Sequence, residues 1–257
     1  MPLTLPVRHN EKLAQVVERI NQDRELHQLW KCANINAVDR SGITDHGEVH
    51  IRIVANIALK LLRLLDDGGV PMSVVKNYGL TNQDAEVIVV LAACCHDLGI
   101  SIHRHHHEEY SLILAERKTR ELLEPFYPIE ERTILTAEVL HAVAAHRSDE
   151  QCLTTEASIL KLADALDMTK GRSRIPFEAG AVNIHSVSAA AIDQVTLSAG
   201  ETKPVHIEVL MNNSAGIFQL DELLRRKLAN STIAPYVEVV ARIEGEIEKR
   251  LIQMYAI

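Results

Sequence analysis

The chain has 257 residues, 27 of them basic and 35 acidic, and its formal charge is -8. Apolar residues make up 47% and charged residues 24%, the composition of a folded globular protein, which excludes a disordered or collagen-like chain. No apolar run approaches the roughly 18 residues of a membrane-spanning helix, and the acidic balance argues against broad nucleic-acid binding.

The first 180 residues are predicted to form a helical domain. Apolar side chains at three- and four-residue steps predict a helix over 46–65. Thr81 and Asp84 form a capping box at the start of a second helix, which we expect to end at Gly99. Because this second helix is apolar on nearly every face, we expect it at the centre of a bundle.

Three more helices are expected in the same domain. The third covers 107–124, and Pro128 stands at the first position of the fourth. Either Thr154 or Thr155 caps the fifth helix, which we expect to stop near Gly171. These segments predict an all-α domain.

The pattern changes after Gly180. Alternating apolar residues predict strands over 205–211 and 237–243 and, more weakly, over 192–197. Helical spacing appears in 218–228, and a last helix is expected over 244–255. We therefore predict a mainly α protein, with a helical bundle and a small C-terminal α+β domain that starts at residue 181. Exposed sheet edges make a homodimer the expected assembly.

Histidine and cysteine usage add two expectations. The chain has 13 histidines, and nine of them lie between His46 and His146, which points to metal or phosphate chemistry. The four cysteines show no C-x-x-C spacing, and the N-terminal residues show no secretory signal. We therefore expect reduced thiols and a cytoplasmic location.

Several histidines and aspartates fall on the expected helices. His46 and His50 lie one turn apart on the first helix, so they share a face. His96 and Asp97 follow each other at the end of the buried helix, and Asp164 lies in the fifth helix. Buried side chains of these types must be paired or bind a cation. Mixed imidazole and carboxylate ligands suit Mn, Fe, Co, Ni or Zn, and suit Mg less well.

The segments that carry these residues resemble a known family. They are His50-Ile51-Arg52-Ile53-Val54-Ala55, Cys95-His96-Asp97-Leu98-Gly99 and Leu162-Ala163-Asp164-Ala165-Leu166-Asp167. In this order they resemble the H…HD…D signature of the HD superfamily of metal-dependent phosphohydrolases, over roughly residues 45–170. The wider stretch is similar to an archaeal-type group whose members mostly lack an assigned substrate. The resemblance implies an HD-type bundle and one divalent metal bound by His50, His96, Asp97 and Asp164.

A second metal is implied by two more histidines. The segments around His107 and His146 resemble those of the dinuclear HD hydrolases, which include the HD-GYP cyclic-dinucleotide phosphodiesterases. If the resemblance holds for both segments, His107 and His146 bind a second metal ion and Asp97 bridges the two ions. That group has two adjacent histidines where this chain has His146-Arg147, and its Gly-Tyr-Pro motif is absent here. The alternative is a one-metal site in which both histidines contact phosphate. His46 is either a further ligand or a neighbour of the ligands.

The resemblance also implies the reaction. It is the hydrolysis of a phosphate ester, a monoester or a diester, of a nucleotide or related small molecule, through a metal-activated water that Asp97 orients. Arg147 and Lys161 are expected to act in catalysis. Arg104, Arg172 and Arg174 are expected to bind the substrate phosphate, because a guanidinium matches two phosphate oxygens.

A non-catalytic function is the alternative. The chain would then be a metal-containing ligand-sensing or regulatory module, with the C-terminal domain binding a partner or a second ligand. The complete ligand set favours an enzyme. Neither a Walker-type glycine loop nor a serine or cysteine nucleophile motif is present in the sequence.

Overall fold

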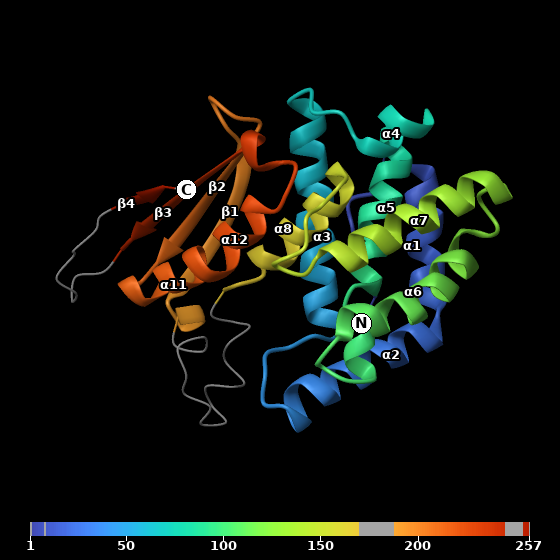
Figure 1. Cartoon of the computed structure of the whole chain (residues 1–257), viewed down its shortest axis with the longest axis horizontal. Coiled ribbons are helices and arrows are strands. Elements are labelled where there is room, and N and C mark those ends of the chain that lie inside the picture. The colour runs from blue at the N-terminus through green and yellow to red at the C-terminus, as the bar shows by residue number, and fades with distance from the viewer. Residues whose placement is uncertain (1, 8, 170–187, 245–253, 257) are drawn as a thin grey trace.

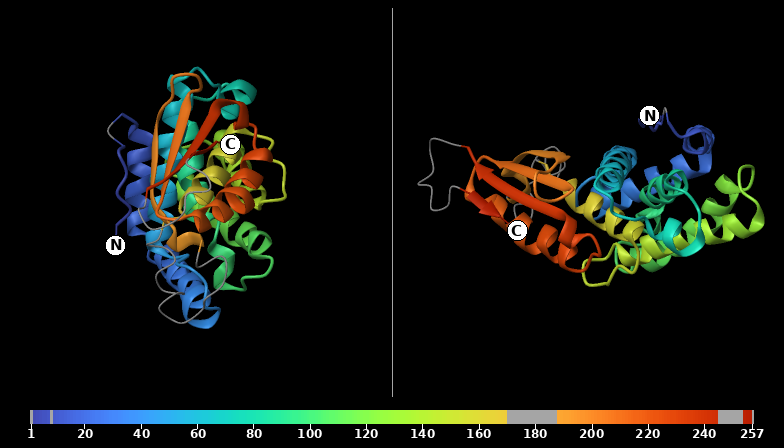
Figure 2. Two further views of the ribbon diagram at one scale, coloured as in Figure 1. Left: turned by 90° about the vertical axis from the view of Figure 1, so that its left-hand side faces the viewer. Right: turned by 90° about the horizontal axis from the view of Figure 1, so that it is seen from above.

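The computed structural model describes residues 2–7, 9–169, 188–244 and 254–256. These residues form a helical bundle and a smaller α+β unit that packs against one side of it (Figures 1 and 2). The predicted fold class is therefore confirmed. The predicted boundary between residues 180 and 181 lies outside the described residues. Within the described residues, no helix has the length and apolar character required to cross a membrane.

The bundle contains eight α-helices in the described residues and two short helical turns between them. The α-helices are α1 (Glu11–Gln22), α2 (Arg24–Asn34), α3 (Glu48–Asp67), α4 (Ser73–Tyr78), α5 (Asn82–Cys95), α6 (His107–Leu123), α7 (Ile129–Ala145) and α8 (Thr155–Leu166). The turns are the π-helical η1 (Ile35–Arg40) and the 3-10 helical η2 (Leu98–Ser101).

Helix α5 lies at the centre of the bundle. The Thr81 hydroxyl accepts from the Asp84 backbone N–H, and the Asp84 carboxylate accepts from the Thr81 N–H at 2.9 Å, which is the predicted capping box. Every residue from Asp84 to Cys95 is buried, and the helix packs against α1, α3, α7 and α8. A helix that is apolar on nearly every face is stable only in such surroundings, and the predicted central position is confirmed.

The end of α5 differs from the expectation. The helix stops at Cys95, and Gly99 lies in the 3-10 turn η2. Gly99 is needed for its small size, because a Cβ there would lie 2.0 Å from the carbonyl oxygen of His107. Ser111 on α6 accepts from the Gly99 N–H at 2.8 Å and donates to the His96 carbonyl at 2.6 Å. These contacts fix the turn that carries His96 and Asp97 against the start of α6.

Three other helix ends can be compared with the prediction. Pro128 is the residue before α7 and not its first residue. The Thr154 hydroxyl accepts from the Ala157 N–H at 3.2 Å and begins α8, as expected. However, α8 ends at Leu166, well before Gly171, because the Asp167 backbone leaves the helical conformation.

The α+β unit is built on a four-stranded sheet in the order β1 (Ile192–Ala199), β2 (Val205–Met211), β3 (Val237–Ile243) and β4 (Met254–Ala256). The pair β1–β2 is antiparallel, β2–β3 is parallel and β3–β4 is antiparallel. The three predicted strands are confirmed. The helix predicted for 244–255 is wrong at its end, where β4 supplies hydrogen-bonding partners to the free edge of β3. Residues 245–253 lie outside the described part.

The connection between the parallel strands β2 and β3 crosses over the sheet. It contains η3 (Ser214–Gly216), α11 (Ile217–Gln219), η4 (Leu220–Arg225), α12 (Arg226–Ala229) and η5 (Ala234–Tyr236). Residues 217–229 form continuous helical structure, which agrees with the helical spacing of 218–228. This crossover segment, residues 217–229, lies in front of the sheet in Figure 1 and packs against α8 of the bundle.

Candidate metal centre

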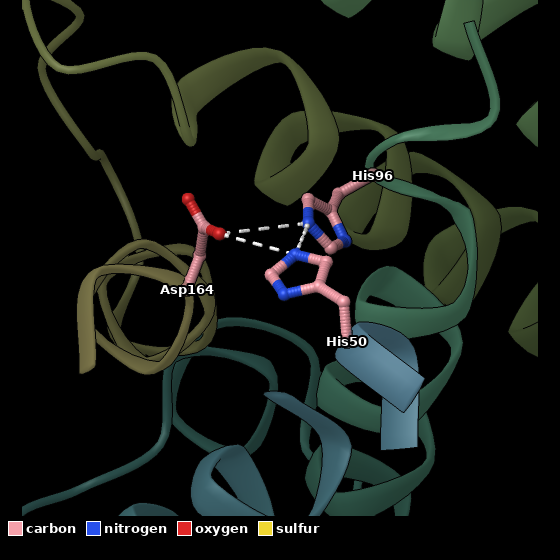
Figure 3. A group of neighbouring side chains, drawn as sticks. All are labelled: His50, His96 and Asp164. Atoms are coloured by element: carbon pink, nitrogen blue, oxygen red, sulfur yellow. Dashed lines mark hydrogen bonds and ion pairs between the residues drawn. The ribbon is translucent and has the colours of Figure 1, made fainter. Parts of the chain in front are cut away.

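Three side chains from three elements point toward one another inside the bundle (Figure 3). His50 lies in the first turn of α3, His96 directly follows α5, and Asp164 lies in the last turn of α8. The His50 Nε2 atom is 3.2 Å from Nε2 of His96 and 3.4 Å from Oδ1 of Asp164. Oδ2 of Asp97 is 3.4 Å from Nε2 of His50 and 3.2 Å from Nε2 of His96. The four residues predicted to hold one metal are thus close together.

The hydrogen bonds of the two imidazoles decide which nitrogen faces the centre. His50 Nδ1 lies 2.6 Å from Oδ2 of Asp167, and His96 Nδ1 lies 2.9 Å from the Ala93 carbonyl oxygen. Both partners are acceptors, so Nδ1 carries the proton in each ring. Two Nε2 lone pairs and the carboxylate oxygens then face one another, an arrangement that favours a cation between them. The donor set therefore fits a divalent transition metal.

A second group of potential ligands shares Asp97 with the first. Oδ1 of Asp97 lies 3.2 Å from Nε2 of His107, the first residue of α6. His146, at the end of α7, has Nδ1 2.6 Å from the Val143 carbonyl oxygen. One ligand atom from each of Asp97, His107 and His146 lies within 4.8 Å of the other two. The two carboxylate oxygens of Asp97 thus face different groups.

The charges of these buried groups depend on one another. Burial lowers the pKa of His146, and the neighbouring His96 and Lys227 add to this effect, so the pKa falls to about 3. His146 is therefore neutral at neutral pH, which is the form that binds metal. Burial opposes ionisation of Asp97, but His96, His107 and His50 outweigh it and hold the pKa of this carboxyl well below its usual range.

A pocket of about 860 Å³ opens onto this centre. Asp97, His107, His146 and Asp164 contribute to its wall. The bundle supplies other residues, and the crossover segment supplies the facing wall with Gln219, Leu223, Arg226 and Lys227. The volume is within the range of about 300–1,000 Å³ that is usual for small-molecule sites.

The predicted basic residues lie in different places. Arg104 and Arg147 line the pocket, with Arg104 Nη1 at 2.6 Å from His107 Nδ1 and Arg147 Nε at 2.8 Å from Asp149. Lys161 is fully buried, and its amine donates to the carbonyl of Glu150. Lys161 is not among the described residues that line the pocket. Its position therefore gives no support to a catalytic role.

Three other predicted positions complete the comparison. Arg172 and Arg174 lie outside the described residues. His46 lines the pocket, with Nδ1 at 2.6 Å from the Thr44 carbonyl oxygen. Its ring centroid is 5.5 Å from that of His50, but it belongs to neither of the two ligand groups found among the described residues.

Two site residues were missed by the sequence reasoning. Asp167 contacts His50. It lies three residues after Asp164, and residues at that spacing are neighbours on a helix, so the sequence did contain a signal for it. Lys227 forms an ion pair with Asp164. No local pattern marks Lys227, because it lies far away in the sequence.

Asp167→Ala is expected to weaken metal binding about 10–100-fold, the usual cost of losing the partner that orients a histidine ligand. Without the carboxylate, His50 loses the acceptor that places its proton on Nδ1. Titration with Mn²⁺ measures the change. Asp67→Ala, at the exposed far end of α3, is the control and should bind Mn²⁺ like the wild type. Equal affinity in both variants would contradict the orienting role.

Comparison with known proteins agrees with this geometry. The HD domain family model matches residues 48–169, which include all six histidines and aspartates of the two ligand groups. An uncharacterized protein of Methanocaldococcus jannaschii is 42% identical over 231 residues, which cover 90% of this chain and 89% of that protein. No solved structure matches the chain. The chain belongs to the HD domain family, whose members are generally metal-dependent hydrolases.

Proposed function

We propose that the protein is a metal-dependent phosphohydrolase that acts on a phosphate ester of a nucleotide or a related small molecule. The observation that carries the proposal is the position of Asp97. One of its oxygens faces His50 and His96, and the other faces His107, at the wall of a pocket. A carboxylate in that position can hold a water and a cation next to a bound substrate.

The residues around Asp97 have separable tasks. A bound divalent cation supplies Lewis-acid activation of water and of the phosphoryl group. Asp97 orients the attacking water and accepts a hydrogen bond from it. Arg104 and Arg147 line the same pocket and can each contact phosphate oxygens through a planar guanidinium. Their positive charges neutralise the charge that develops on the phosphoryl oxygens.

The rest of the pocket suits an organic group larger than phosphate. Ile43, Met168 and Leu223 contribute apolar surface, whereas Thr44 and Gln219 contribute hydrogen-bonding groups. Apolar walls with a few polar groups are typical of sites that bind a ring system. These features support a nucleotide or a similar phosphorylated compound as the substrate.

The test is metal-dependent turnover. The purified chain, loaded separately with Mn, Fe, Co, Ni, Zn or Mg, is assayed on a panel of nucleoside monophosphates, diphosphates, triphosphates and cyclic nucleotides. We expect hydrolysis of at least one class, its loss after chelation and its recovery on adding the metal back. Stoichiometric binding of metal and nucleotide without any hydrolysis would contradict the proposal and would favour a ligand-sensing module.

A further inference from the structure

We propose that the crossover segment of the α+β unit contributes to substrate binding at the metal centre, and that its Lys227 binds the substrate phosphate. This inference rests on the proposed function and specifies which part of the chain completes the site. Lys227 lies on α12, outside residues 48–169 that match the HD domain family. The phosphate contact is therefore assigned to a part of the chain that the family match does not include.

The amine of Lys227 reaches the centre directly. Its Nζ forms an ion pair with Oδ2 of Asp164, and the two side chains are only 12% and 14% exposed. Oδ1 of Asp164 instead faces the imidazoles, at 3.4 Å from Nε2 of His50 and 3.8 Å from Nε2 of His96. One oxygen of Asp164 is thus directed to the ligand group and the other to the ammonium. Lys227 also lines the pocket, so its charge is available to a ligand there.

The crossover segment has two faces with different tasks. Leu220, Leu224 and Leu228 recur every four residues and are buried in the hydrophobic core. The pocket is lined by a second stripe at helical spacing, which consists of Gln219, Leu223, Arg226 and Lys227. A segment that only connects β2 with β3 needs the leucine stripe to pack in the core, but it does not need the stripe that lines the pocket. The second stripe places two cationic side chains, those of Arg226 and Lys227, at the wall of the pocket.

The pairing of charges along the segment singles out Lys227. Glu222 lies 3.0 Å from Arg226, and Asp221 lies 3.5 Å from Arg225. Lys227 instead pairs with a residue of the bundle. Withdrawing an ammonium from water costs free energy unless a specific partner compensates for it. The near-burial of Lys227 therefore marks the contact with the centre as specific.

The charge of the centre explains why a further cation is useful. Asp97, Asp164 and Asp167 carry three formal negative charges, one more than one divalent cation neutralises and one fewer than two such cations carry. Phosphate brings further negative charge, so with either number of bound ions an added positive charge beside Asp164 favours its binding. The ammonium of Lys227 supplies this charge and can donate to a phosphate oxygen, a charge-assisted hydrogen bond of the stronger kind.

The experiment measures binding of inorganic phosphate to the full-length, Mn²⁺-loaded protein by calorimetric titration. Lys227→Met keeps the length of the side chain and removes its charge. We expect phosphate affinity to fall about 10-fold or more, the scale of one hydrogen bond to a charged group, while the number of bound Mn²⁺ ions stays unchanged. Lys227→Arg should restore most of the affinity. Arg225→Met, on the same segment at a side chain that is 63% exposed, is the matched control and should bind phosphate like the wild type.

A second variant keeps the test independent of the Lys227–Asp164 pair. Leu223→Asp places a negative charge on the same pocket face and should also weaken phosphate binding while Lys227 remains. Thermal unfolding of each variant establishes that it is folded. Unchanged phosphate affinity in both Lys227→Met and Leu223→Asp would overturn the inference. Weaker phosphate binding in a protein that hydrolyses no phosphate ester would support the inference and refute the proposed function.

Discussion

Asp97→Ala is expected to abolish metal-dependent turnover, with a loss larger than the roughly 10–100-fold cost of removing an outer partner of a metal ligand. The carboxylate faces both ligand groups, with Oδ2 at 3.2 Å from His96 and Oδ1 at 3.2 Å from His107. Its removal therefore takes one ligand from each group and also the acceptor for the attacking water. Steady-state kinetics on the best substrate of the nucleotide panel measures the loss.

The fold of this variant should remain largely intact. Asp97 lies in the turn after α5, and that turn is attached to α6 by the hydrogen bonds of Ser111, which do not involve the Asp97 side chain. Circular dichroism and thermal unfolding check this expectation. Asp39→Ala, at an exposed carboxylate of η1, is the control and should keep full activity. Activity near the wild-type level in Asp97→Ala would refute the assigned mechanism.

His107→Ala and His146→Ala are each expected to bind one metal ion fewer than the wild type and to keep the other. Both histidines belong to the group that shares Asp97, whereas His50, His96 and Asp164 form the other group. The loss of one ligand from a three-residue group should empty that group and leave its neighbour occupied. Metal analysis after dialysis, with activity measured on the same samples, gives the result.

The matched control is His105→Ala, because His105 lies on the exposed loop before α6. This variant should keep the full metal content. The competing expectation is a one-metal centre in which His107 and His146 contact phosphate. In that case both variants would keep all their metal and would lose turnover by about 10²–10³-fold, as when one transition-state hydrogen-bond donor is removed. Unchanged metal content in both variants would thus contradict a second metal site.

Local sequence patterns determined the elements that carry the candidate site. The capping box at Thr81 and the nearly all-apolar α5 predicted a central buried helix with His96 and Asp97 at its end, and alternation predicted β1, β2 and β3. These features depend on residues that are close in the sequence. A capping box pairs a side chain with the backbone N–H three residues away, and periodic apolar residues define one face of a helix or strand. The ligand set His50, His96, Asp97 and Asp164 was predicted instead from the resemblance of three separate segments to the HD signature.

Contacts between distant segments decided the rest. Lys161 lies three residues before Asp164, so the sequence allowed it to face the centre, but its flexible side chain donates to the Glu150 carbonyl. Lys227 reaches Asp164 across 63 residues, because the β2–β3 crossover packs against α8. The proton on His50 Nδ1 is set by Asp167, 117 residues away. Packing of the helices decides which groups lie within about 3 Å of one another, the length of a hydrogen bond. Those groups determine which partner a side chain contacts and which tautomer an imidazole adopts. Local periodicity contains no information about those groups, so only the tertiary structure determined them.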